Sequence, residues 1–271
     1  MTSTTPARLP TSQLFSLEGK TLIATGGTGG LGSEMCLAMA ESGADIVSIY
    51  PPGDAGQSRL EETIRSRASI DGGRKVLGFE CDISDSQSLR DTFDKIWRAG
   101  VVPDILLNCA GLNRRGPIEE MTDEKIDLIF AVNLKAAYVA AQEFGVHLIK
   151  LGRPGKIINI ASFTSFVAMT NVSAYAATKG GVLQMTKAFS NEWAVHGIQV
   201  NCICPGYIKT PLSEALVQQF PEMEQYIIDR TPAGRWGKPA DLRGAVLFLA
   251  SPASDYVTGT SIVVDGGMMF R

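Results

Sequence analysis

The sequence lacks several features that would point to particular partners. Lysine and arginine (25) do not outnumber aspartate and glutamate (28), and the formal net charge is −3. A basic surface for nucleic acid or for an acidic membrane is therefore not expected. Apolar runs of about 18 residues, the length of a membrane-spanning helix, do not occur. The opening residues, MTSTTPARLPTSQLF, lack the apolar stretch of a secretory signal, so a cytoplasmic protein is predicted.

Residues that commonly bind metals are also scarce. There are 2 histidines and 5 cysteines, and an odd number of cysteines cannot all pair within one chain. Cys202 and Cys204 alternate in VNCICPG, so both are expected on one face of a strand, at a spacing too short for a zinc hook. His147 and His196 fall late in helical segments, where surface or capping roles are favoured. The sequence therefore predicts reduced cysteines in a core and no metal site.

What the sequence does contain is a regular alternation of strand-length apolar runs and helical segments, and 45% of its residues are hydrophobic. The expected strands are 21–25, 45–50, 75–80, 104–108, 156–161, 198–203 and 261–265. Because these runs are nearly continuous in Val, Ile and Leu, they predict one α/β domain with a Rossmann-like, doubly wound, seven-stranded parallel sheet and helices on both faces. We expect the domain at 17–271, a flexible extension at 1–16, and a short helical lid at about 209–235.

A glycine-rich segment follows the first expected strand directly. It reads TGGTGGLG, from Thr25 to Gly32, and opens into the helical pattern SEMCLAMAESG. Glycines at such a turn let the backbone approach a pyrophosphate, whose charge suits the N-terminus of a helix. The strand before and the helix after favour dinucleotide binding over a plain glycine turn. The glycine spacing, with Gly26, Gly30 and Gly32, is not the commonest one for such motifs.

A tyrosine and a lysine stand four residues apart among alanines in SAYAATKG, from Ser173 to Gly180. On a helix this spacing places Tyr175 and Lys179 on one face. A free tyrosine has a pKa of about 10, and lowering it to about 7 requires roughly 4 kcal/mol. One cation about 4 Å away supplies that much at an effective dielectric constant of about 20. The pair therefore predicts a proton donor with a lowered pKa, with room beside it for a cofactor and a substrate.

Together these motifs resemble the short-chain dehydrogenase/reductase family. The resemblance rests on the glycine spacing, on NCAG at 108–111, and on the set Asn133, Ser162, Tyr175 and Lys179. It implies an NAD(P)-dependent oxidoreductase that transfers a hydride between nicotinamide and a carbonyl or secondary alcohol. Tyr175 would be the general acid or base, and Lys179 would lower its pKa and hold the nicotinamide ribose. Ser162 would bond the substrate carbonyl, and Asn133 would organise a water leading protons to the lysine.

The resemblance also implies a set of cofactor contacts. They are Gly26, Thr28, Gly30, Leu31, Gly32, Tyr50, Asp82, Ile83, Asn108, Ala110, Gly111, Tyr175, Lys179, Pro205, Gly206, Ile208 and Thr210. Among these, Asp82 would read the adenine amino group and Asn108 would lie beside the adenine ribose. From the residues alone, Asp82 in CDISDSQS could equally cap the next helix, since aspartate is a favoured N-cap.

The choice between NAD and NADP is normally made at the end of the second strand, where an acid bonds the ribose 2′-hydroxyl. That place is Tyr50, followed by Pro51 and Pro52, so neither an acid that selects NAD nor an adjacent arginine that selects NADP is present. Arg59, one turn into the next helix, is either a phosphate partner or a plain surface arginine. Because nothing at Tyr50 repels a 2′-phosphate, the sequence leans towards NADP.

The segments GLNRRGPIEE and GKIINIAS, with the stretch that starts at RTPAGRWGKP, are most similar to a sugar-acid branch of the family that contains 2-deoxy-D-gluconate 3-dehydrogenases. Members of that branch are also described as 2-dehydro-3-deoxy-D-gluconate 5-dehydrogenases. The branch implies a keto sugar acid as substrate, whose carboxylate an arginine fork can grip. The expected substrate residues are Asn113, Arg114, Phe163, Thr164 and Tyr207, with Arg115 as a second candidate for the fork.

Two alternatives stay open at this point. The apolar residues Phe166, Val167 and Met169 would suit a less polar ketone, which would make the protein a ketoreductase of a biosynthetic pathway. A cofactor-binding sensor without turnover is disfavoured, because all four catalytic residues of the family are present. Gly180 and Gly181 each cost a helix interior about 1 kcal/mol relative to alanine. Close contact between subunits would explain them, and the family implies a homotetramer or homodimer.

Overall fold

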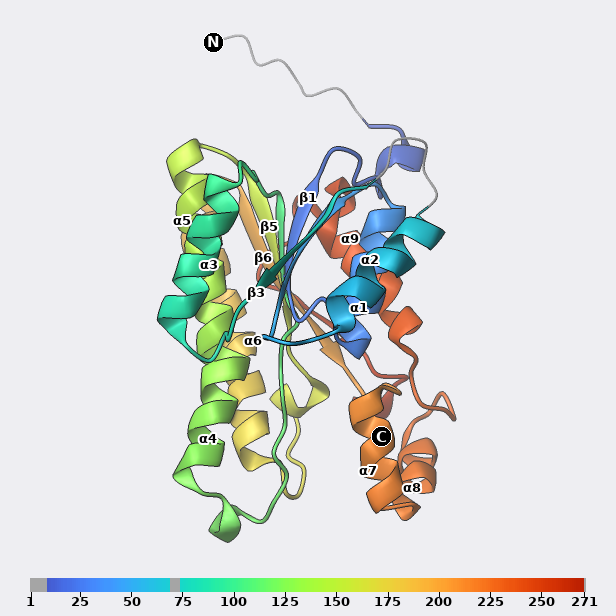
Figure 1. The fold of residues 1–271 in the computed structure, drawn as a ribbon. Coiled ribbons are helices and arrows are strands. Elements are labelled where there is room, and N and C mark those ends of the chain that lie inside the picture. The colour runs from blue at the N-terminus through green and yellow to red at the C-terminus, as the bar shows by residue number, and fades with distance from the viewer. Residues whose placement is uncertain (1–8, 69–73, 271) are drawn as a thin grey trace.

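The protein folds around one seven-stranded parallel sheet with the strand order β3-β2-β1-β4-β5-β6-β7 (Figure 1). The computed structural model describes residues 9–68 and 74–270. The strands are β1 (Thr21–Thr25), β2 (Asp45–Tyr50), β3 (Val76–Glu80), β4 (Ile105–Asn108), β5 (Gly155–Ile160), β6 (Ile198–Pro205) and β7 (Ser261–Val264). The predicted fold class and all seven predicted strands are confirmed. The order reverses between β1 and β4, and this reversal opens a crevice at the carboxyl ends of the strands.

Helices cover both faces of the sheet. They are α1 (Gly30–Glu41), α2 (Gly56–Arg67), α3 (Ser86–Arg98), α4 (Asp123–Phe130), α5 (Ala136–Leu151), α6 (Ser173–Trp193), α7 (Pro211–Gln219), α8 (Glu222–Arg230) and α9 (Arg243–Ala250). In Figure 1, α1, α2 and α9 lie on one side of the sheet, and α3, α5 and α6 lie on the other. Each side has its own apolar core: Phe93, Phe144 and Phe189 pack in one, and Met35 and Met39 in the other. Burial on both faces explains why the strands read as continuous apolar runs.

The helical stretch from α4 to α5 contains one π-helical segment. Between α4 and α5 the residues Ala131–Lys135 form a π-turn. Such a turn adds a residue to the helical repeat and commonly marks a functional position. Asn133 lies in this segment and is 1% exposed. The apolar periodicity on either side continues, so the sequence pattern alone does not reveal the interruption.

The segment 209–235 forms the helix pair α7 and α8, and no strand lies within it. Where the segment leaves and rejoins the sheet, Lys209 N–H donates to Gly237 O and Gly237 N–H donates to Tyr207 O, both at 2.9 Å. In Figure 1 the pair (orange) lies at the same end of the molecule as the carboxyl ends of the strands. Its helical character is confirmed, and its role as a lid stays a prediction.

Residues 1–8 of the predicted N-terminal extension lie outside the described residues. From Leu9 onward the chain is placed, with a 3-10 turn at Thr11–Gln13. Ala253 N–H donates to Leu14 O at 3.1 Å, and Leu17 is fully buried. In residues 9–68 and 74–270, no helix is both long and apolar enough to cross a membrane.

The two glycines in α6 have different surroundings. A Cβ added to Gly181 would lie 2.9 Å from Leu134 Cδ2, so this glycine allows α6 to pack closely on the π-turn of the same chain. This contact within the chain accounts for Gly181, and a contact between subunits at either glycine stays a prediction. A Cβ added to Gly180 would meet no atom of this chain within 4 Å.

Candidate active site

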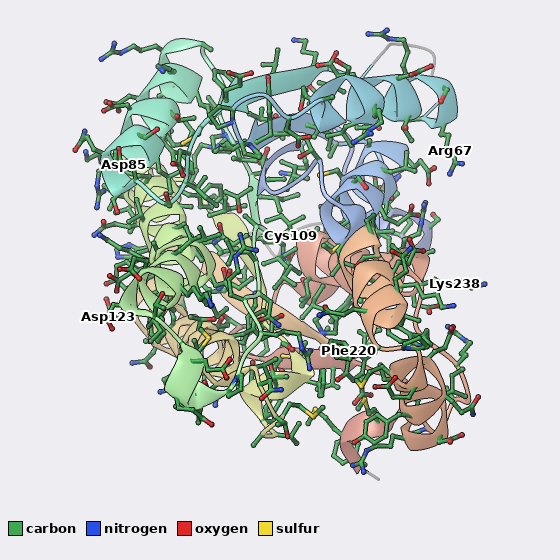
Figure 2. The ribbon with its side chains drawn as sticks, turned by 60° about the horizontal axis from the view of Figure 1, so that its bottom comes forward. Arg67, Asp85, Cys109, Asp123, Phe220 and Lys238 are labelled. Carbon is green, nitrogen blue, oxygen red and sulfur yellow. The ribbon has the colours of Figure 1, made fainter. Side chains whose placement is uncertain are left out.

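A cavity of about 1070 Å³ lies at the carboxyl edge of the sheet. Most of the sequence-predicted residues line it, namely Gly26, Thr28, Gly30, Leu31, Gly32, Tyr50, Asp82, Ile83, Ala110, Gly111, Asn113, Ser162, Phe163, Thr164, Tyr175, Lys179, Pro205, Gly206, Tyr207, Ile208 and Thr210. Figure 2 looks towards this end of the molecule, and Cys109, which also lines the cavity, lies near the middle of the view. Phe220, between α7 and α8, and Asp123, at the start of α4, flank it in this view.

The glycine motif shapes one wall of the cavity. Gly26 has φ +69°, and a Cβ on it would lie 2.7 Å from the backbone of Ala110. A Cβ on Gly32 would lie 2.1 Å from Gly26 O, so only glycine allows the turn to close on the start of α1. The N-cap of α1, Gly29, offers no side chain to the first N–H groups of the helix. These N–H groups and the helix dipole fit a pyrophosphate, so the residues present fit a dinucleotide.

The opposite end of the cavity holds Ser162, Tyr175 and Lys179. Ser162 Oγ accepts hydrogen bonds from Thr164 N–H at 3.1 Å and from Thr164 Oγ1 at 2.9 Å, so its own proton is free for another acceptor. Lys179 is 4% exposed, and its Nζ donates to Ile160 O at 2.7 Å. The same Nζ lies 5.6 Å from the centre of the Tyr175 ring. The predicted serine, tyrosine and lysine are thus in one place.

Burial shifts the pKa values of both ionisable groups at this end. Burial raises the pKa of Tyr175, and a hydrogen bond with Ser162 opposes this only in part. Burial also lowers the pKa of Lys179 to about 8. The ammonium of Lys179 donates to the carbonyl of Ile160, and its effect on the pKa of the phenol stays a prediction. Burial therefore favours the protonated phenol of Tyr175, and its role as general acid or base stays a prediction.

Asn133 does not line the cavity but holds its wall. Leu112 N–H donates to Asn133 Oδ1 at 2.8 Å, and Asn133 Nδ2 donates to Leu112 O at 2.8 Å. The same Nδ2 donates to Thr178 Oγ1 at 3.3 Å, and Thr178 Oγ1 donates to the carbonyl of Tyr175 at 2.7 Å. Asn133 therefore ties the loop after β4 to the helical turn that carries Tyr175. Its role in ordering a water stays a prediction.

The structure places the two predicted adenosine contacts, Asn108 and Asp82, differently relative to the cavity. Asn108 is 5% exposed and lies behind the wall, where its Nδ2 donates to Asn159 Oδ1 at 2.9 Å, so the next residue, Cys109, lines the cavity in its place. This follows from strand alternation, which turns neighbouring side chains to opposite sides. Asp82 lines the cavity, and its carboxylate accepts from Ser84 Oγ at 2.7 Å. The cap of α3 is Asp85, so the alternative role for Asp82 was wrong.

The two arginines of the NRR segment, Arg114 and Arg115, differ in their position relative to the cavity. Arg115 lines the cavity and Arg114 does not, so the structure favours Arg115, the second candidate, and substrate binding by either arginine stays a prediction. Burial raises the pKa of Tyr207, while the cations of Arg115 and Arg230 lower it. Among the ion pairs of residues 9–68 and 74–270, none joins Arg115 to an acid. Its guanidinium is therefore not paired with a neighbouring carboxylate in these residues.

Apolar side chains form the rest of this wall. Phe163 and Tyr207 lie with ring centres 5.2 Å apart, and Met169 also lines the cavity. Phe166, by contrast, is 43% exposed and does not line the cavity, and neither does Val167. The Oδ1 atom of Asn113 is buried and has no hydrogen-bond partner among the residues that the structure describes. The wall therefore combines an apolar surface with one cation and one unsatisfied acceptor.

The other residues that were weighed for metal binding are accounted for. His147 stacks on Trp97 at 4.0 Å between ring centres. Cys202 and Cys204 lie on one face of β6 with their sulfurs 3.9 Å apart, as expected, and both are free thiols. In the described part of the chain, no group of three or more His, Cys, Asp or Glu residues is arranged to hold a metal ion.

Comparison with known proteins agrees with this geometry. The family model described as enoyl-(acyl carrier protein) reductase matches residues 26–269. The 2-dehydro-3-deoxy-D-gluconate 5-dehydrogenase of Escherichia coli (strain K12) is 40% identical over 257 residues, which cover 95% of this chain and 98% of that protein. The chain belongs to the short-chain dehydrogenase/reductase family. It is accordingly an NAD(P)-dependent oxidoreductase that acts on CH–OH groups.

Other members of the short-chain dehydrogenase/reductase family are similar along nearly the whole chain. A gluconate 5-dehydrogenase from Burkholderia cenocepacia, solved with NADP and tartrate, is 36% identical with a TM-score of 0.88, covering 96% of this chain and 98% of that one. A putative 2-deoxy-D-gluconate 3-dehydrogenase from Agrobacterium tumefaciens, solved with NADP, is 38% identical with a TM-score of 0.87, covering 95% and 99%. The 3-oxoacyl-[acyl-carrier-protein] reductase FabG of Thermotoga maritima is 33% identical over 253 residues, covering 93% and 99%.

The structure also reveals cavity residues of this short-chain dehydrogenase/reductase that the sequence reasoning missed. Asp54 and Ser213 line the cavity. Asp54 is four residues beyond Tyr50, and the turn Pro51–Asp54 brings it back to the glycine motif, where it accepts from Thr28 Oγ1 at 2.6 Å. An aspartate after Pro-Pro-Gly signals a tight turn. That signal was available, but the direction in which the turn runs was not.

Proposed function

We propose that this enzyme interconverts a keto sugar acid and the corresponding hydroxy acid, with Tyr175 as general acid and base. The observation that carries the proposal is that Arg115, which forms no ion pair in the described chain, lines the same cavity as Ser162, Tyr175 and Lys179. A guanidinium grips a carboxylate with charge-assisted hydrogen bonds. Relatives named for gluconate and for 2-dehydro-3-deoxy-D-gluconate support the same substrate class.

Ser162, Tyr175 and Lys179 have different roles in the proposed reaction. The bound nicotinamide supplies or accepts the hydride. Ser162, whose oxygen already accepts two hydrogen bonds from Thr164, donates its proton to the substrate carbonyl oxygen. Tyr175, protonated in the free site, transfers its proton to that oxygen during reduction and takes it back during oxidation. Lys179, whose Nζ lies 5.6 Å from the centre of the Tyr175 ring, would present its ammonium to the phenol and to the nicotinamide ribose.

Two further parts of the fold suit a lid that closes over the substrate and a surface for contact between subunits. The pair α7–α8 follows the cavity residues Ile208 and Thr210, so its movement would cover the substrate. Phe130 (37% exposed) and Tyr138 (46% exposed), on the helical segment from α4 to α5, offer apolar surface for a homodimer or homotetramer. All five cysteines are free thiols, which favours the reducing cytoplasm.

A ketoreductase of a less polar ketone is the second candidate. Phe163, Met169 and Tyr207 in the cavity wall favour it, and so does the similarity to an acyl-carrier-protein reductase. The two candidates differ in what Arg115 does. A sugar acid needs its charge, and a neutral ketone does not.

The test is to follow reduced-nicotinamide absorbance with 5-keto-D-gluconate and with a neutral ketose of similar size. We expect the wild type to reduce the acid with the higher kcat/KM. Replacing Arg115 by Ala should cost 1.5–3 kcal/mol on the acid, about 10- to 150-fold in kcat/KM, and almost nothing on the neutral ketose. Arg114→Ala is the matched control and should change the ratio less than about threefold, because it does not line the cavity. Equal losses on both substrates would contradict the carboxylate grip.

A further inference from the structure

The turn after β2 places a carboxylate in the cavity wall, against the glycine motif. Asp54 lines the cavity together with Thr28, Tyr50 and Arg59. In a dinucleotide site of this topology, the end of β2 meets the adenosine ribose, about 20 residues after the glycine motif. The sequence shows Tyr50 at that point and no acid, but the turn supplies one four residues later.

The carboxylate of Asp54 is fixed by the loops on both sides. Oδ2 accepts from Thr28 Oγ1 at 2.6 Å, and Oδ1 accepts from Gly56 N–H at 2.8 Å. A Cβ on Gly56 would lie 2.8 Å from Thr28 Cβ and 3.0 Å from both carboxylate oxygens, so glycine is what permits this close approach. These hydrogen bonds, led by the one from Thr28, lower the pKa of Asp54. The group is therefore charged at neutral pH and held in place by the glycine motif itself.

Other acids strengthen the negative field around the ribose end. Burial raises the pKa of Tyr50, and the charges of Glu80, Glu61 and Asp54 raise it further. The opposing cation is Arg59, which is exposed, lines the cavity and contributes to lowering the pKa of Asp54. A 2′-phosphate placed here would meet the fixed charge of Asp54, whereas a free 2′-hydroxyl could donate a hydrogen bond to it.

We propose that Asp54 sets the ratio of NAD to NADP affinity, by accepting a hydrogen bond from the free 2′-hydroxyl and by repelling the 2′-phosphate. It limits the affinity for NADP without excluding NADP, because the half-exposed Asp54 side chain is screened by solvent and opposed by Arg59. The assignment concerns the cofactor alone and holds whichever carbonyl compound is the substrate. It moves the specificity determinant from the strand end to the following turn.

The test uses adenosine 5′-monophosphate and adenosine 2′,5′-bisphosphate, which differ only in the 2′-phosphate, as calorimetric probes of the full-length protein. In Asp54→Asn we expect the affinity for the bisphosphate to rise on the order of tenfold, the effect of one unit charge at this range. Affinity for the monophosphate should stay within about threefold or fall. The gain for the bisphosphate should shrink from low salt to 0.5 M salt, because exposed charges are screened.

Glu62→Gln is the matched control, since Glu62 is an exposed acid on α2 that does not line the cavity. It should leave the ratio of the two affinities unchanged. A gain in Asp54→Asn that is equal for both probes, or no gain for the bisphosphate, would overturn the assignment. So would an equal gain in Glu62→Gln, which would point to net charge alone. Because no substrate is used, failure here is distinct from failure of the keto sugar acid proposal.

Discussion

The two ends of the cavity are built from different kinds of groups. At the catalytic end, Lys179 is 4% exposed and Ser162 is 5% exposed, and both are held by a long helix or by the sheet edge. At the ribose end, Tyr50 and Asp54 are half-buried, and Arg59 is exposed on the first turn of α2. Burial dominates the first end, where it lowers the pKa of Lys179 to about 8. Hydrogen bonds dominate the second, where they lower the pKa of Asp54.

This difference indicates how each end works. A desolvated proton donor or cation is strongly perturbed, because little water compensates its charge. Removing such a group should abolish most of the turnover. A half-exposed charge acts over a few ångströms in competition with solvent and salt, so it tunes a preference instead of creating an activity. Substitutions at the catalytic end should therefore have much larger effects than those at the ribose end.

The largest effect is expected for Tyr175→Phe, which keeps the ring and removes the acid. General acid–base catalysis contributes about 10²- to 10⁴-fold, so kcat should fall by at least that factor while the Kd for the cofactor barely changes. Steady-state kinetics and cofactor titration measure the two quantities. Tyr138→Phe, on α5 and outside the cavity, is the control. Retention of a third of wild-type turnover in Tyr175→Phe would remove the mechanism.

Lys179→Met should reduce both turnover and cofactor affinity, since one ammonium serves both. Lys187→Met, an exposed lysine on the same helix, is the matched control and should change neither. A Lys179→Met enzyme with unchanged cofactor affinity would argue against the ribose contact. The loss in turnover should exceed any change seen at the ribose end.

The shifted pKa of Lys179 predicts how the free energy of unfolding depends on pH. Its pKa falls from 10.5 to about 8 on folding, so the unfolded chain binds more protons between these values. The free energy of unfolding should therefore rise with pH from about 8 to about 10, by roughly 1–3 kcal/mol from this group. Urea denaturation at pH 8 and pH 9.5 measures it. In Lys179→Met this contribution to the rise should be absent, and an identical rise in both proteins would show that the buried lysine is not its source.

The smallest effect is expected for Tyr50→Asp at the ribose end. A new acid there should shift the ratio of kcat/KM values towards NADH by about threefold to tenfold, since it adds a second half-exposed charge beside Asp54. The measurement compares NADH and NADPH with one substrate. A ratio that does not move would place the discrimination at Asp54 and Arg59. If this ratio shifted by as large a factor as kcat falls in Tyr175→Phe, the expected difference between the two ends of the cavity would be contradicted.

The local pattern of the sequence was enough to predict the strands, the glycine turn and the tyrosine–lysine pair. Apolar runs buried on both faces specify a parallel sheet, and an i,i+4 spacing on a helix fixes a shared face. Both are short-range regularities, which neighbouring residues alone create. The spacing singled out Tyr175 and Lys179, whereas Asn133 and Ser162 were predicted from the resemblance to the short-chain dehydrogenase/reductase family.

Only the tertiary structure decided which of two adjacent residues faces the cavity. It also decided which distant residues a turn brings together. It selected Cys109 over Asn108 and Arg115 over Arg114, because the side of a strand or loop that faces the crevice depends on the packing of other elements. It brought Asp54 onto Thr28, although the two are 26 positions apart, through a turn whose path the sequence does not encode locally. It also turned the ammonium of Lys179 to a backbone carbonyl, because a buried donor binds the nearest acceptor that the fold supplies.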